Sequence, residues 1–130
     1  MIERITPEHI STLQPGQIFV FGSNHFGHHA GGAARYALDH FGAEWGNGEG
    51  LQGQSYAIPT MEGLVRTRQA VERFIAFAKA HPELTFLVTP IGCGIAGYTA
   101  DEIAPFFNGA KDIENIYLPE SFLKVLLRKK

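Results

Sequence analysis

The stretch VFGSNHFGHHAGGAARYALDHFG, residues 20–42, passes from the pattern of a buried strand to that of a helix. Apolar residues lead up to Asn24. The segment from Gly31 to Phe41 has a helical pattern, and Gly42 is placed as its C-terminal left-handed residue. Three histidines and several glycines lie between the two elements. Such a junction serves either a bound ligand or only a tight turn, and this stretch alone leaves both interpretations open.

A second glycine-rich junction, PIGCGIAGYTADE, occupies residues 90–102. It follows the apolar run 84–89 and precedes a Thr99–Glu102 capping box that opens a helix. Glycines let the main chain approach a ligand closely, and a helix N-terminus adds unpaired N–H groups and partial positive charge. Two such junctions facing each other are expected to hold an anion such as linked phosphates through backbone amides alone.

The rest of the chain predicts alternating strands and helices. Strands are predicted at residues 1–5, 17–21, 55–58, 84–89 and 115–118. Helices are predicted at the short segment opened by Thr6-Pro7, at 31–41, at 64–81, after Thr99 with a kink or early end at Pro105, and from Pro119 onward. The longest helix is expected to bury Val71, Phe74, Ile75 and Ala78, and residues 43–54 are expected to form a loop.

This order of elements predicts one three-layer α-β-α domain spanning residues 1–130. Its central sheet is expected to be mostly parallel or mixed and to have about five strands. Hydrophobic residues make up 45% of the 130-residue chain and charged residues 18%, as in a globular domain with a real core.

Composition also excludes several classes of partner. The net charge of -2 disfavours a surface that holds nucleic acid by its phosphates, so we expect no sequence-specific nucleic-acid partner. The basic run 128–130 is interpreted as a solvated helix end. Cys93 is the one cysteine, which excludes an intramolecular disulfide and suits a reducing compartment. No apolar run approaches the roughly 20 residues needed to cross a bilayer, so a cytoplasmic protein is expected.

At these junctions the chain resembles the macrodomain family, whose members bind ADP-ribose or hydrolyse its linkages. Residues 20–24 are similar to the family's strand that ends in Asn, and Gly31-Gly32 lie in a glycine run before a helix that ends at Gly42. Residues 90–98 resemble the family's second phosphate loop, with Cys93 where a small Ser or Thr is usual. Residues 55–59 resemble the strand between. The resemblance covers about residues 17–107 and is to small, divergent bacterial and phage members.

The resemblance implies a macrodomain-like fold and a nucleotide ligand. The expected partner is ADP-ribose or a related NAD-derived nucleotide, or a macromolecule that carries ADP-ribose, and no cofactor or metal is implied. The ligand-binding residues carried over from the family are Asn24, Gly31, Gly32, Ala33, Gly92, Cys93, Gly94, Ile95, Ala96, Gly97 and Tyr98.

Two departures from the family pattern bear on activity. Ala34 stands where the similar hydrolases carry an Asp thought to help activate water, and no Asp lies near residues 19–20 to take the adenine amine. Binding and hydrolysis therefore both remain open, as does a protein whose pocket takes no ligand. If the chain is a hydrolase, Glu49 is the candidate general base, and His28 is the candidate loop histidine acting as acid or base.

Several single residues keep two interpretations. The Asn24 amide can hold a ribose hydroxyl or close a turn on its own backbone. Cys93 can be a nucleophile or a small packing residue, and Tyr98 can cover the ligand or pack at the mouth of its loop. Trp45 is expected to pack under its loop. His25, His28 and His29 lack a second set of ligands, so no metal site is predicted.

Overall fold

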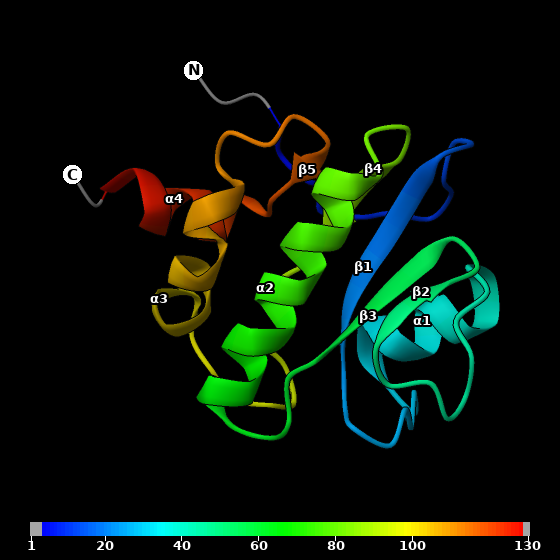
Figure 1. The fold of residues 1–130 in the computed structure, drawn as a ribbon. Helices are drawn as coiled ribbons and strands as arrows, with labels where there is room; N and C mark the ends of the chain where they lie inside the picture. The colour runs from blue at the N-terminus through cyan, green and yellow to red at the C-terminus, as the bar shows by residue number, and fades with distance from the viewer. Residues whose placement is uncertain (1–3, 129–130) are drawn as a thin grey trace.

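The computed structural model describes residues 4–128. Figure 1 shows the elements in the order β1 (Gln17–Ser23), α1 (Gly32–His40), β2 (Gly50–Gln52), β3 (Ser55–Pro59), α2 (Leu64–Ala80), β4 (Thr85–Val88), α3 (Ala100–Ile103), the 3-10 helix η1 (Ala104–Ala110), β5 (Ile116–Tyr117) and α4 (Glu120–Arg128). Within this range, no helix is both long and apolar enough to span a bilayer.

The strands form one five-stranded mixed sheet, as the sequence predicts. The strand order is β2-β3-β1-β4-β5, and β2 alone runs antiparallel to its neighbour. β1 is central, with Val20 opposite Tyr56 of β3 on one side and Val88 of β4 on the other. The carboxyl ends of β1, β3 and β4 therefore lie at the same end of the sheet, where ligands bind in α/β proteins.

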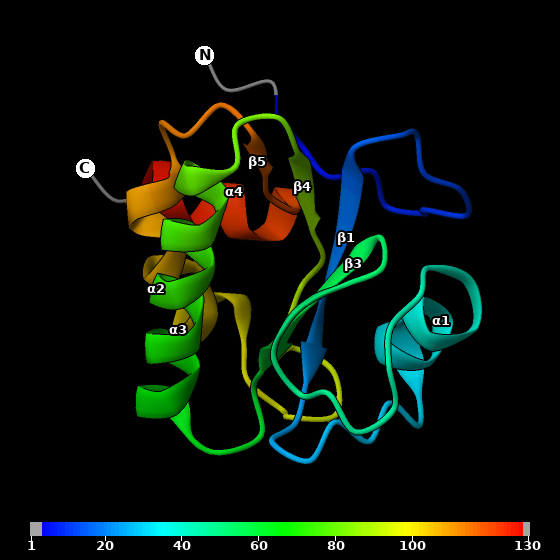
Figure 2. The same cartoon turned by 45° about the vertical axis from the view of Figure 1, so that its right-hand side comes forward.

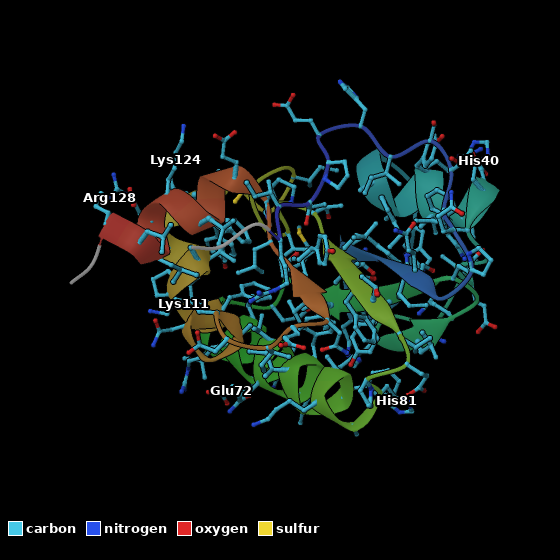
Figure 3. The ribbon with its side chains drawn as sticks, turned by 90° about the horizontal axis from the view of Figure 1, so that it is seen from above. His40, Glu72, His81, Lys111, Lys124 and Arg128 are labelled. Atoms are coloured by element: carbon cyan, nitrogen blue, oxygen red, sulfur yellow. The ribbon has the colours of Figure 1, made fainter. Side chains whose placement is uncertain are left out.

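Alternate residues of each strand point to opposite faces of the sheet, and different helices cover the two faces. Phe19 and Phe21 of β1 pack with Ala34, Ala37 and Phe41 from the α1 region. The other face carries the larger core, which α2, η1 and α4 cover, with members Ile18, Val20, Tyr56, Ile58, Phe74, Phe86, Val88, Phe107, Phe122 and Leu126 among others. In Figure 3, His40 of α1 and His81 after α2 lie on opposite sides of the sheet. The predicted three-layer α/β domain is confirmed.

Local sequence signals explain the buried face of α2 and both ends of α3. α2 buries Val71, Phe74 and Ala78 as predicted, and Ile75 packs against the same core. The Thr99 side chain accepts from the Glu102 N–H and the Glu102 side chain accepts from the Thr99 N–H, which forms the predicted capping box at α3. Pro105 lies just inside η1, so the α-helix changes to 3-10 geometry where proline removes an N–H donor.

The N-terminal segment and the loop at 43–54 differ from prediction. No helix forms at residues 6–16, because Pro15-Gly16 leaves too short a segment to be helical without extensive packing. Of the strand predicted at 1–5, residues 1–3 lie outside the described range, and Ile5 makes only a parallel bridge to Leu118. The segment predicted as a loop contains β2, which pairs with β3 across the Gly53-Gln54 turn, where Gly53 has a φ of 60°.

Candidate functional site

The two glycine-rich junctions meet at the carboxyl end of the sheet. The loop after β1 and the loop after β4 lie side by side at this end in both Figure 1 and Figure 2. They enclose a cleft of about 740 Å³, which residues 60 and 61 also line. Its lining residues are Gly22, Ser23, Asn24, His28, Ala30, Gly31, Gly32, Ala33, Ala34, Thr60, Met61, Thr89, Pro90, Ile91, Gly92, Cys93, Gly94, Ile95 and Ala96.

A second hollow of about 940 Å³ continues this cleft. The two share Gly32, Ala33, Thr89 and Pro90 in their linings. The rest of the second hollow comes from the N-terminal segment, from Phe19 and Tyr36, and from the start of α4, where its polar lining groups are Thr6, Glu8, His9, Ser11, Glu120, Ser121 and Lys124. The cleft and the hollow thus form one continuous groove, glycine-rich on one side and lined by both apolar and polar side chains on the other.

Unpaired backbone amides characterise the second junction. Among residues 4–128, the N–H groups of Gly92, Gly94, Ile95 and Ala96 donate no hydrogen bond. The loop is held instead by the Gly97 N–H to the Gly94 carbonyl (3.0 Å) and the Tyr98 N–H to the Gly92 carbonyl (2.8 Å). Consecutive free amides in a fixed loop are what an anion-binding nest requires.

The first junction contributes a helix N-terminus. Gly31, the N-cap of α1, is extended and provides no side-chain cap, and the first turn carries no acidic residue. In the described chain, the N–H groups of Gly31, Gly32 and Ala33 donate no hydrogen bond. An uncapped helix start with free amides favours an anion through both hydrogen bonds and the helix dipole.

Glycine is required at particular points of this site. Gly32 and Gly92 have φ values of 60° and 75°, which side-chain-bearing residues rarely adopt. A Cβ added at Gly22 would lie 3.4 Å from the Gly92 nitrogen, so the end of β1 and the second loop approach closely. A Cβ at Gly94 would meet nothing within 4 Å, which places open space beside the free amides.

Most of the predicted ligand-binding residues line the cleft. Asn24, Gly31, Gly32, Ala33, Gly92, Cys93, Gly94, Ile95 and Ala96 do so. Gly97 and Tyr98 do not: Gly97 has a φ of 82° and closes the loop turn, and the Tyr98 ring packs against the larger core. The structure thus supports the packing interpretation for Tyr98.

The Asn24 side chain is used within its own loop. Its Nδ2 donates to the His28 carbonyl (3.1 Å), and its Oδ1 accepts from the His28 N–H (2.9 Å). Asn24 therefore folds the loop back on itself, as in the turn interpretation, while its position still lines the cleft. One N–H and one lone pair of this amide remain for a ligand.

The two predicted catalytic residues are not brought together. His28 lines the cleft, but Glu49 is absent from the lining, and both of its carboxylate oxygens accept from Arg73 of α2, at 2.6 Å and 2.9 Å. Beside this pair lies the buried Tyr56, whose pKa is raised to about 12, first by burial and then by the Glu49 charge, against a lowering by Arg73. Glu49 joins the loop to α2, and we do not carry it into the proposed chemistry.

Cys93 and Ala34 offer no nucleophile or base. Burial raises the pKa of the Cys93 thiol, and the Glu102 charge raises it further, which disfavours the reactive thiolate. Ala34 is buried in the α1 face of the core and lines the cleft with a methyl group. Among residues 4–128, no three His, Cys, Asp or Glu side chains are placed to hold a metal ion.

His29 has a role that sequence reasoning did not find. It is fully buried, with Nε2 near the Asn47 carbonyl (3.1 Å) and the Gln52 Oε1 (3.3 Å), and with Nδ1 near Ser23 Oγ (3.5 Å). Both Nε2 partners are acceptors, so Nε2 carries the proton. The side chain ties the loop after β1 to the loop before β2. The one signal in the sequence was the apolar strand that precedes His29. An apolar strand does not specify which groups will bond to a buried histidine.

The predicted packing of Trp45 under its loop is wrong. Its side chain is 59% exposed, and its ring stacks on His28 with centroids 5.1 Å apart. The loop before β2 is pinned to the first junction by the Gly46 N–H, which donates to the Gly27 carbonyl (2.9 Å). This bond carries Trp45 out to the mouth of the cleft, beside His28.

Comparison with protein-family models, with curated proteins and with solved structures finds no match for this chain. The class that the fold and the site define is an α/β protein with a cleft, bordered by unpaired main-chain amides, between two glycine-rich strand-to-helix loops. The resemblance to macrodomains remains a prediction from the residues quoted above.

Proposed function

We propose that the protein binds ADP-ribose or a related NAD-derived nucleotide in the cleft between its two glycine-rich loops. The observation that carries this proposal is the set of unpaired amides, from Gly31 to Ala33 and from Gly94 to Ala96, around one cleft. Among residues 4–128, those that line this cleft include no Lys, Arg, Asp or Glu. A diphosphate suits such a site because main-chain donors from two directions can share its charge without a basic side chain.

The hollow that continues the cleft is where we place the remainder of such a ligand. In this proposal the diphosphate lies across the shared residues Gly32 and Ala33, and the adenosine end occupies the hollow beside the N-terminal segment. Aromatic and apolar groups there, including Phe19 and Tyr36, offer surface to a base. The carboxylates of Glu8 and Glu120 line the same hollow and are acceptors for an exocyclic amine.

Binding is favoured over hydrolysis by the chemistry of the lining. Activation of water requires a base within hydrogen-bonding reach of the reacting centre. Among the residues that line the cleft, His28 is the one ionisable side chain besides the Cys93 thiol, and Ala34 provides no carboxylate. A hydrolase in the same pocket would therefore depend on His28, which is the specific observation that keeps this second candidate.

Calorimetric titration tests the proposal directly. ADP-ribose is expected to bind with one site per chain, and AMP, which lacks the second phosphate and ribose, is expected to bind more weakly. Failure of ADP-ribose to bind at millimolar concentration would reject the proposal and favour a protein whose pocket takes no ligand. Incubation with an ADP-ribosylated protein separates the two candidates, because only a hydrolase releases free ADP-ribose. If release occurs, His28→Ala should abolish it.

A further inference from the structure

Three exposed rings form a continuous surface at the mouth of the cleft. His28 stacks on Trp45, with centroids 5.1 Å apart and planes 10° apart, and on Phe26, at 5.8 Å and 30°. Phe26 and Trp45 are 69% and 59% exposed. We call Phe26, His28 and Trp45 the aromatic rim. Exposed stacked rings leave unburied apolar surface, and such surface beside a cleft marks a binding site.

The aromatic rim is fixed to the cleft. His28 belongs to both, because it lines the cleft and is the ring common to both stacking contacts. The Asn24 side chain holds the His28 backbone at N–H and carbonyl, and buried His29 anchors the next position. The rim is therefore held in one place before a ligand binds. Stacking of a planar group on it costs the protein little conformational entropy.

Two carboxylates, those of Glu44 and Glu62, are held beside residues of the aromatic rim. The Glu62 carboxylate accepts from the His25 N–H at 2.9 Å, directly beside Phe26, and Glu44 precedes Trp45 in the chain. The Glu44 carboxylate accepts from the Asn47 side chain rather than from a Lys or Arg. Glu49, the other acid of this loop, is neutralised by Arg73. Electron-rich ring faces and nearby carboxylates both favour a cation over the rim.

We infer that the aromatic rim binds the positively charged nicotinamide ring of NAD+, whose diphosphate lies in the cleft. This inference rests on the proposed function and specifies its ligand. The nicotinamide is joined to the ribose beyond the diphosphate, so it leaves the cleft on the side opposite the adenosine. The second hollow and the aromatic rim border the glycine-rich lining through different residues, Gly32 and Ala33 for the hollow and His28 for the rim.

A pyridinium ring fits the rim better than the other planar groups that can be attached to a ribose. A guanidinium gains most from a bidentate carboxylate, but Glu44 and Glu62 each have one oxygen already engaged. A polynucleotide would bring phosphates next to these two carboxylates, in a protein of net charge -2. A pyridinium ring needs no bidentate partner and gains from stacking and from cation–π attraction.

Titrations with NAD+, NADH and ADP-ribose test the inference at pH 8. NADH is the matched ligand because it differs in carrying a neutral, non-aromatic dihydronicotinamide. NAD+ is expected to bind about 2-fold to 5-fold more tightly than NADH, from a cation–π contribution of about 0.5–1 kcal/mol at exposed rings. Trp45 is the single tryptophan of the chain, so saturation with NAD+ is also expected to quench the intrinsic emission, and ADP-ribose is expected to leave it nearly unchanged.

Variants show whether the rim is responsible. Trp45→Leu and Phe26→Leu are expected to reduce or abolish the preference for NAD+ over NADH while affinity for ADP-ribose is kept. Leu127→Ala, at an exposed residue of α4, is the control and should keep the preference. Equal affinity for NAD+ and NADH, or a preference that survives in both rim variants, would overturn the inference although ADP-ribose still binds.

Two further outcomes are decisive. Tighter binding of ADP-ribosyl-arginine than of NAD+ would assign the rim to a guanidinium and overturn the inference. Absence of binding by all of these ligands would instead reject the proposed function, and with it the inference that depends on it.

Discussion

The substitution Gly94→Val separates ligand binding from folding. Gly94 has an ordinary φ, and a Cβ there would meet nothing within 4 Å, so the folded loop has room for a larger side chain. The same space is where we place the diphosphate. A valine is therefore expected to change the free energy of unfolding by no more than about 1 kcal/mol, as surface substitutions generally do.

The loss of affinity follows from the amides that the valine obstructs. A hydrogen bond from an N–H group to a charged oxygen contributes about 1.5–3 kcal/mol, and Gly94 has consecutive free N–H groups at Ile95 and Ala96 beside it. Displacement of the anion from one of these donors should weaken ADP-ribose binding by about 10-fold to 150-fold.

Gly109→Val provides the matched control. Gly109 lies in η1, outside the cleft lining, and a Cβ there likewise meets nothing within 4 Å. Calorimetry with ADP-ribose and urea unfolding should be measured for both variants and for the unmodified chain. The reasoning is refuted if Gly94→Val binds ADP-ribose within twofold of the unmodified chain, or if the two variants lose affinity equally.

Three further predictions concern the loops and the core beside them. The pKa of Tyr56 is raised above the ordinary 10.0 to about 12, so protonated Tyr56 adds stability below pH 10 that is lost between pH 10 and 12. The midpoint of urea unfolding should therefore fall over this pH range by the equivalent of roughly 2–3 kcal/mol. Tyr56→Phe should remove that fall. Glu49→Gln should lower stability by about 1 kcal/mol or less, because the pair with Arg73 is partly exposed, and should leave ADP-ribose affinity unchanged; a large loss of affinity would return Glu49 to the site. Gly27→Ala should destabilise the chain by more than about 2 kcal/mol, since its φ is 70° and the new Cβ would lie 2.4 Å from the Asn47 nitrogen; an unchanged melting temperature would contradict this packing.

Strong periodic patterns and local turn chemistry predicted most of the fold. α2 and its buried face, the capping box at Thr99 and the buried strands β1, β3 and β4 follow from patterns that act within a few residues. β2 could not be predicted this way, because three residues gain strand structure only by pairing with β3. The helix predicted after Thr6 fails for the complementary reason, since its signals are local and it lacks the length to be stable.

In the candidate site, too, the features that follow from local patterns were predictable and those that depend on distant contacts were not. The convergence of the two junctions follows from parallel neighbouring strands, so nine of the predicted residues line one cleft. Side chains on the loop before β2 were not predictable, because their positions depend on which distant groups that loop meets. Arg73 takes Glu49 away from the cleft, and the Gly46–Gly27 hydrogen bond brings Trp45 to its mouth. Neither partner is visible in a local pattern.

Both edges of the sheet are formed by short strands. The outermost strands are three residues long at β2 and two at β5, and Gly50 within β2 has a φ of 104°. Short, distorted borders leave few main-chain groups on which another chain can add a strand. The molecule can therefore expose apolar rings and free amides to a small ligand at one end of the sheet. Its sheet edges offer few main-chain groups through which copies of the chain could associate into larger assemblies.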